Sequence, residues 1–164
     1  MTTSNSAKYI LQWQTDPQFC LGVTAIAAGA NVTLSTLAGA GNPQTQWNLD
    51  PNTGLITLAA NPDLVLDVSG NYIGNGTPLV LANYVIGRPQ QQWNWVGTPK
   101  AVMNLGQPGM CVDNSAGNHN PGNQIWLWSY GAGNTNQAWL SLHVPALLRS
   151  GAVQEHSNGL VGVG

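Results

Sequence analysis

The 164-residue chain has few charged side chains, since only 6% of its residues are Asp, Glu, Lys or Arg. Four Lys and Arg residues supply too little positive charge for a nucleic-acid surface, which requires a basic patch or stripe. No apolar run approaches the roughly 20 residues of a membrane-spanning helix. The opening segment 1–6 is polar and lacks the apolar core of a secretion signal. We therefore expect a cytoplasmic protein, or one released without a classical signal, that binds no nucleic acid and does not insert into membranes.

Sustained helical patterns are also missing. The hydrophobic runs are about four to six residues long, and turn residues separate them, among them 20 glycines and 10 prolines. No window has the apolar stripe that an amphipathic helix requires. The sequence therefore predicts an all-β protein of many short strands, long enough to form one domain with a sizeable core.

Three tryptophans, Trp47, Trp93 and Trp139, recur at a spacing of 46 residues. They close the similar phrases Pro-Gln-Thr-Gln-Trp, Pro-Gln-Gln-Gln-Trp and Thr-Asn-Gln-Ala-Trp. Alternating runs recur with nearly the same period at 32–37, 79–84 and 125–130. A fixed period of this length indicates three copies of one supersecondary unit.

The repeat predicts a domain over residues 1–144, with lobes at about 8–53, 54–99 and 100–144. Residues 145–164 follow it as a C-terminal extension with several apolar residues. We expect this extension to pack on the domain or on the partner subunit of a homodimer.

The two cysteines, Cys20 and Cys111, occupy equivalent positions in the first and third copies. A disulfide requires Cα atoms within about 7 Å of each other. Because a threefold arrangement holds equivalent positions well apart, we expect two free thiols, buried as small hydrophobic side chains.

The third lobe contains the Cys-Leu-Asp-like phrase Cys111-Val112-Asp113 and the Gln-x-Trp phrase Asn136-Gln137-Ala138-Trp139. With these phrases and their counterparts in the other two lobes, the chain resembles the ricin B-type lectins (R-type, or QxW, lectins) over residues from about 8 to 144. The resemblance implies a β-trefoil of three four-stranded lobes with pseudo-threefold symmetry. It also implies a non-enzymatic protein that binds galactose or N-acetylgalactosamine and requires no cofactor or metal. Where disulfide-containing members have a second cysteine, this chain has Leu37, Tyr84 and Tyr130. In this respect it is similar to the intracellular ricin B-like lectins of fungi.

A galactose-type sugar has an edge of hydroxyl groups and an apolar face, so its recognition needs a carboxylate, an amide and an aromatic ring. In the third lobe the resemblance implies that Asp113 accepts the hydroxyl protons and that Trp128 is the platform under the apolar face. Asn136 is the expected amide, and Gln137 is expected to brace Asp113 from behind. The third lobe is therefore the predicted main site.

Two further features of this lobe bear on the site. The turn-rich loop 114–123 is expected to place Asn118 and His119 at the rim. Because Trp126 alternates with Trp128, we expect one of the two to face inward or to pack against a neighbour.

The second lobe keeps Asp67, with Gln90 and Gln91 at the amide positions, but has Ala82 in place of the platform. The residues that would have to replace the platform are Asn83, Tyr84 and Tyr72. We expect a weaker site here. In the first lobe glycine replaces the aspartate and serine replaces the platform, so we expect no site.

Other interpretations remain open. Asp67 and Asp113 are also residues that cap backbone N–H groups in turns. Catalysis is not expected, because they lie in different lobes and glycoside hydrolysis needs two carboxyl groups about 5–10 Å apart. The alternative function is that of a β-trefoil protease inhibitor acting through exposed loops, since a fold does not determine a function.

Overall fold

The computed structural model describes residues 7–37, 41–71 and 73–145 of the chain. These residues form a protein of short strands and short 3-10 helices. The strands are β1 (Tyr9–Trp13), β2 (Phe19–Val23), β3 (Val32–Thr36), β4 (Trp47–Asp50), β5 (Leu55–Leu58), β6 (Asn61–Val68), β7 (Thr77–Asn83), β8 (Trp93–Asn94), β9 (Met103–Asn104), β10 (Met110–Asn114), β11 (Ile125–Ser129) and β12 (Trp139–His143). The 3-10 helices are η2 (Pro43–Thr45), η3 (Pro89–Gln91), η4 (Ser115–Gly117) and η5 (Thr135–Gln137).

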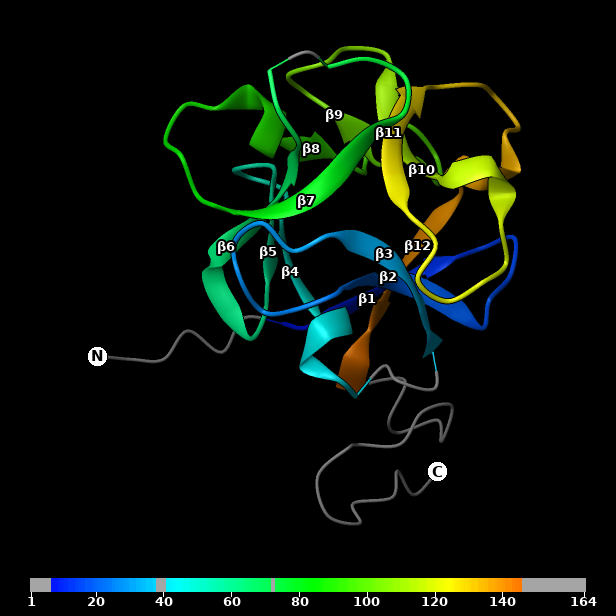
Figure 1. The fold of residues 1–164 in the computed structure, drawn as a ribbon, viewed down its shortest axis with the longest axis horizontal. Coiled ribbons are helices and arrows are strands. Elements are labelled where there is room, and N and C mark those ends of the chain that lie inside the picture. Colours follow the sequence, from blue (N-terminus) through cyan, green and yellow to red (C-terminus); the bar gives the residue numbers. More distant parts are fainter. Residues whose placement is uncertain (1–6, 38–40, 72, 146–164) are drawn as a thin grey trace.

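The strands form three four-stranded lobes: β1–β4, β5–β8 and β9–β12. Each lobe contains an antiparallel hairpin, formed by β2 with β3, β6 with β7, and β10 with β11. In Figure 1 the hairpin of β6 lies at the left, that of β10 at the right, and β2 and β3 lie below. β1 pairs with β12 and so joins the two ends of the described chain. The predicted β-trefoil fold is confirmed.

The three repeated tryptophans form equivalent parts of the core. Trp47, Trp93 and Trp139 are at most 4% exposed. Their Nε1 atoms donate to backbone carbonyl oxygens of the hairpin strands, at 3.1 Å to Leu21, 3.0 Å to Leu66 and 3.1 Å to Val112. Each phrase that ends in tryptophan therefore anchors its hairpin to the centre of the fold, because a buried indole N–H needs an acceptor.

Neighbouring lobes are joined through three glycines at hairpin loops. Gly29, Gly76 and Gly122 have φ between 87° and 89°, a conformation that favours glycine. Their N–H groups donate to carbonyl oxygens on a strand of another lobe: Gly29 to Leu81 at 2.7 Å, Gly76 to Leu127 at 2.8 Å, and Gly122 to Leu34 at 2.7 Å. The loop of each lobe therefore lies against the hairpin of the next, in a closed cycle.

Both cysteines are free and fully buried, as expected. Burial raises the pKa of each thiol to about 12, and the negative charge of Asp113 adds to the effect at Cys111. The predicted extension lies outside the described residues, apart from residue 145. Among residues 7–37, 41–71 and 73–145, no helix is long and apolar enough to cross a membrane.

Candidate functional site

In the third lobe, Gln137 holds the carboxylate of Asp113 in place. Asp113 lies on β10 and is 2% exposed. Its Oδ2 accepts a hydrogen bond of 2.9 Å from Gln137 Nε2, which also donates to the carbonyl oxygen of Ser129 at 2.9 Å. The oxygen Oε1 of Gln137 accepts from Gly131 N at 3.0 Å. This amide therefore ties η5 to β10 and to the end of β11, in the position behind Asp113 that the sequence predicts.

Two tryptophans lie beside this carboxylate on β11. Trp126 and Trp128 are half-buried on the outer face of the strand, whereas Ile125 and Leu127 are buried in the core. The rings of Trp126 and Trp128 stack, with centroids 4.9 Å apart and planes inclined by 27°. Of the two expected alternatives, the structure shows packing against a neighbour: neither ring faces inward, because residues two apart in a strand share a face, and the two rings pack against each other. The indole that contacts Asp113 is that of Trp126.

The contact is a hydrogen bond from Trp126 Nε1 to Asp113 Oδ1 of 2.7 Å. Burial raises the pKa of Asp113, while the hydrogen bonds from Trp126 and Gln137 act in the opposite direction. A carboxylate has about four lone-pair sites. Each oxygen of Asp113 therefore already has one donor and keeps further acceptor capacity.

Asn136 precedes Gln137 on η5 and is half-buried. Its N–H donates to Asn134 Oδ1 at 3.0 Å, so Asn134 caps η5. A Cβ atom at Gly117 would lie 2.6 Å from Asn136 Oδ1, and Gly117 has φ of 63°. The absence of a side chain at residue 117 therefore lets the Asn136 amide lie against the loop that follows β10.

The two predicted rim residues are held by other contacts. Asn118 Oδ1 accepts from the backbone N of Asn120 at 3.1 Å and from its Nδ2 at 2.6 Å. His119 Nδ1 lies 2.7 Å from Asp16 Oδ2 of the first lobe, and its ring is 4.8 Å from that of Trp13. The hydrogen bond from His119 lowers the pKa of Asp16. The structure therefore places His119 against the first lobe, and its described contacts do not include the third-lobe carboxylate.

The second lobe repeats the brace. Gln91 Nε2 donates to Asp67 Oδ2 at 3.1 Å and to the carbonyl oxygen of Asn83 at 3.0 Å, while its Oε1 accepts from Val85 N at 2.8 Å. Asp67 is 6% exposed. The backbone carbonyl oxygen of Asn83 accepts the hydrogen bond from Gln91 Nε2, and that of Gln90 accepts one from Asn104 Nδ2. Gln91 therefore corresponds to Gln137 contact for contact.

Arg88 contacts the second-lobe carboxylate, although the sequence analysis did not single it out. Its Nε lies 3.1 Å from both oxygens of Asp67, and its Nη2 donates to the carbonyl oxygen of Val68 at 3.1 Å. One repeat away in each direction stand Asn42 and Asn134, which cap their 3-10 helices, whereas Arg88 makes no side-chain cap. The break in the repeat was the signal available in the sequence. The guanidinium of Arg88 is thus the hydrogen-bond partner of the second-lobe carboxylate, Asp67.

The second lobe also lacks a ring at the platform position. Ala82 is half-buried there. Of the three residues named as replacements, the side chain of Asn83 is exposed, Tyr84 is 46% exposed, and Tyr72 lies outside the described residues. Tyr84 lines a different cavity.

In the first lobe Gly22 stands where the other lobes have Asp67 and Asp113, so the position has no carboxylate. Ser35 Oγ fills the space that a Cβ at Gly22 would need, and Thr45 takes the place of the bracing glutamine. A shallow cavity of about 240 Å³ remains, lined in part by Thr33, Ser35, Asn42 and Gln44. These side chains are neutral.

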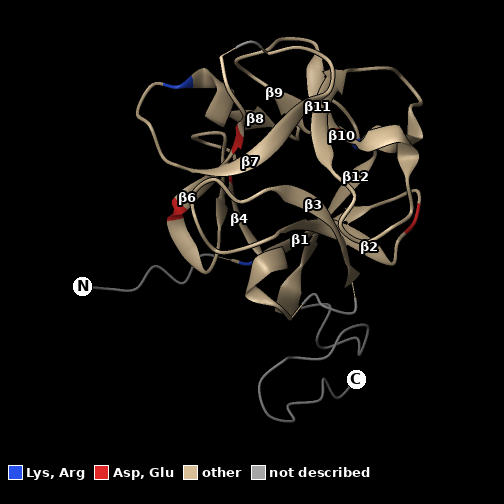
Figure 2. Cartoon of the chain, in the orientation of Figure 1, with Lys and Arg blue, Asp and Glu red and all other residues tan. Residues whose placement is uncertain are grey.

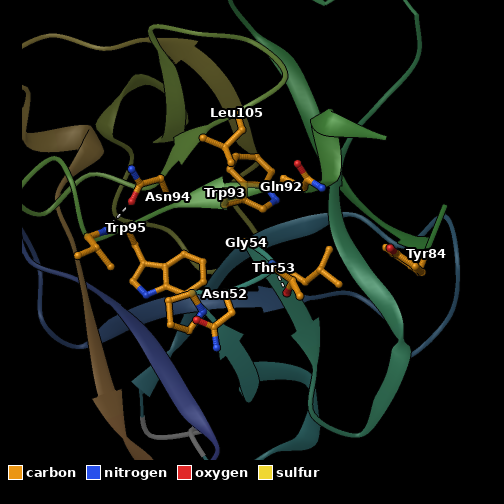
Figure 3. A pocket seen from close by; sticks show the side chains of 12 residues that line it. Asn52, Thr53, Gly54, Tyr84, Gln92, Trp93, Asn94, Trp95 and Leu105 are labelled. Atoms are coloured by element: carbon orange, nitrogen blue, oxygen red, sulfur yellow. Dashed lines mark hydrogen bonds between the residues drawn. The ribbon is translucent and has the colours of Figure 1, made fainter. Parts of the chain in front are cut away.

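A larger cavity of about 720 Å³ lies elsewhere, between the turn that joins β4 to β5 and the segment around β8 (Figure 3). Its lining includes Trp95, Leu105 and Asn52 and none of the predicted site residues. This cavity is therefore distinct from the predicted sugar site, which consists of the side chains around Asp113.

Comparisons with solved structures identify the fold. A designed threefold-symmetric protein, ThreeFoil, superimposes with a TM-score of 0.71 at 22% identity, over 82% of this chain and 97% of that one. The C-half of an earthworm R-type lectin, in complex with GalNAc, has a TM-score of 0.69 at 16% identity, over 84% and 98%. The β-trefoil lectin of a Vibrio vulnificus hemolysin, with bound N-acetyl-D-lactosamine, has a TM-score of 0.64 at 18% identity, over 85% and 96%. No protein-family model and no curated protein matches the chain.

Proposed function

We propose that the chain is a non-enzymatic lectin that binds galactose or N-acetylgalactosamine termini of glycans, mainly through its third lobe. The observation that carries the proposal is the braced carboxylate of Asp113 next to the stacked pair of Trp126 and Trp128. Two lectins among the structural neighbours support a sugar of this kind: the earthworm R-type lectin is solved with GalNAc and the Vibrio vulnificus β-trefoil lectin with N-acetyl-D-lactosamine.

In the proposed complex the apolar face of the sugar lies on the tryptophan pair, with Trp128 as the platform. One hydroxyl group donates to Asp113 Oδ1 and takes the place of the Trp126 N–H, and Asn136 contacts a further hydroxyl. Hydrogen bonds to a carboxylate are stronger than neutral ones. Gln137 keeps the carboxylate fixed throughout, so the site loses little entropy on binding.

The second lobe provides a weaker site in this proposal. A sugar hydroxyl can reach Asp67 only when Arg88 leaves it, and the hydrogen bonds that Arg88 makes in the free protein oppose that movement. The lobe also lacks a tryptophan at the position of Ala82.

A glycan array and calorimetry with methyl β-galactoside test the proposal. Asp113→Asn and Trp128→Ala are expected to abolish binding of methyl β-galactoside at the third lobe, since each removes one of the two main contacts there. Asp63→Asn, at an exposed aspartate of the second lobe, serves as the matched control and is expected to bind like the wild type. Inhibition of proteases by a wild-type protein that binds no glycan would support the alternative function instead.

A further inference from the structure

The cavity near β8 has a floor of aromatic and apolar side chains and a rim of amides. Figure 3 shows Trp95 next to Asn52 on one side, Leu105 across from them, and Tyr84 at the far end. Its volume of about 720 Å³ is within the range of ligand-binding pockets, about 300–1,000 Å³. Val96, 74% exposed, and Leu105, 48% exposed, leave an apolar margin open to solvent.

The indole N–H of Trp95 distinguishes this cavity from the rest of the surface. Five of the seven tryptophans donate Nε1 to a protein acceptor: Trp13, Trp47, Trp93, Trp126 and Trp139. All seven lie within the described ranges, and the two whose N–H has no protein acceptor there are Trp95 and Trp128. Both are half-buried. A buried indole usually finds a hydrogen-bond partner for its N–H, and tryptophan is enriched at interfaces, where one end of the ring is apolar and the other wet. Trp128 lies at the proposed sugar site, so Trp95 is the one indole whose N–H is left without a partner or a proposed ligand.

The polar groups of the cavity are neutral. None of its lining residues is charged, and the cartoon in Figure 2 shows how few of the described residues are charged. Asn94 Oδ1 accepts from Val96 N at 2.9 Å and from Gly97 N at 3.1 Å, so the Nδ2 of Asn94 remains as a donor. The side-chain amides of Asn52 and Gln92 make no hydrogen bond within the described part of the chain. These groups suit a ligand with hydroxyl groups and no charge.

We propose that this cavity is a further carbohydrate site, separate from those at Asp113 and Asp67, which binds a neutral pyranose with Trp95 under its apolar face. The amides of Asn52 and Gln92 exchange hydrogen bonds with its hydroxyl groups. The apolar margin at Leu105 receives an acetamido methyl group or the apolar face of the next sugar ring. An anionic sugar is excluded, because no cation lines the cavity to offset its desolvation. The proposal extends the lectin function but does not depend on Asp113.

The test uses the Asp113→Asn protein, in which the third-lobe site is disabled, on an array of neutral glycans. We expect residual binding that the added pair Asn52→Ala and Gln92→Ala weakens about tenfold or more, since each amide hydrogen bond contributes about 1 kcal/mol. Gln14→Ala, at a half-buried amide of the first lobe, is the matched control. Equal binding with and without the amide pair, or no residual binding, would overturn the proposed site in this cavity.

A second readout follows the Trp95 indole N–H signal by NMR, assigned with Trp95→Phe. We expect it to shift on addition of a neutral glycan that the array selects and to stay unchanged with N-acetyl-leucinamide, a probe for an apolar protein partner. The reverse result would overturn the proposal in favour of such a partner. Failure of the lectin proposal is distinguished because Asp113→Asn would then leave binding at the wild-type level, whatever the amide pair does.

Discussion

The guanidinium of Arg88 lies across the carboxylate of Asp67, with Nε 3.1 Å from both of its oxygens. Asp67 also accepts from Val68 N at 2.6 Å and from Gln91 Nε2 at 3.1 Å. With these donors in place the carboxylate has little capacity left for a ligand. The second lobe thus carries its own internal partner at the point where a sugar would bind.

Replacing Arg88 by asparagine is therefore expected to open the second lobe. Arg88→Asn also restores the residue that caps the helix at the equivalent positions Asn42 and Asn134. We expect a small loss of stability, about 1–2 kcal/mol, from the removed charge-assisted hydrogen bonds. Calorimetry with methyl β-galactoside should show a second, weak binding event.

The double variant Arg88→Asn with Asp67→Asn is the control, because it removes the newly available carboxylate. Persistence of the second event in that protein would show that Asp67 does not bind the sugar. Arg88→Lys, which keeps the charge, is expected to remain like the wild type.

Binding at the third lobe should fall on acidification, because the sugar requires an ionised Asp113. Burial raises the pKa of this carboxyl above 3.8, so affinity is expected to decline at a higher pH than an exposed aspartate would give. Titration of affinity against pH measures this. An affinity that is constant down to pH 4 would contradict it.

Asp113 also gives a stability prediction of definite sign. A carboxyl whose folded pKa exceeds its unfolded pKa destabilises the folded protein as pH rises through the folded value. The free energy of unfolding of the wild type, relative to Asp113→Asn, should therefore decrease from acid to neutral pH. Denaturant unfolding at several pH values measures the difference, and an increase would contradict the assigned direction.

Trp126→Phe removes the donor at Asp113 Oδ1 and keeps a ring to stack on Trp128. The loss of a hydrogen bond to a charged group should lower the free energy of unfolding by about 2 kcal/mol. If a sugar hydroxyl takes the place of that N–H, affinity for methyl β-galactoside should rise by up to about tenfold. Weaker binding would instead show that Trp126 keeps its hydrogen bond in the complex.

The two thiols should be unreactive in the folded protein. Cys20 and Cys111 are fully buried, and burial raises both pKa values to about 12, so little thiolate is present at neutral pH. Alkylation by iodoacetamide, followed by mass spectrometry, is expected to modify neither until denaturant is added. Rapid modification of one thiol would indicate local opening of its strand.

The arrangement of the fold was predictable because it depends on repeated residues. Trp47, Trp93 and Trp139 have the same spacing, the same burial and the same kind of hydrogen bond to a hairpin strand. The brace of Gln137 on Asp113 was predictable for a related reason, since the same residue types recur one repeat earlier as Gln91 and Asp67.

Long side chains were harder to place. Arg88 and His119 reach partners 21 and 103 positions away in the chain, Asp67 and Asp16. No local pattern fixes such contacts, because they depend on which loops the fold brings together. For Trp126 and Trp128 the strand pattern alone chooses between the two expected alternatives, because residues two apart in a strand share a face.

The ring of hydrogen bonds from Gly29, Gly76 and Gly122 means that no repeat is self-sufficient. Gly76 of the second lobe lies beside the rings of Trp126 and Trp128, since a Cβ atom at this glycine would be 3.5 Å from the first ring and 3.7 Å from the second. A fragment that contained the third lobe alone would lack this contact. A duplicated ancestral segment would therefore form a closed fold only when three copies are present. Exchange of one repeat by recombination would change its contacts with both neighbouring lobes.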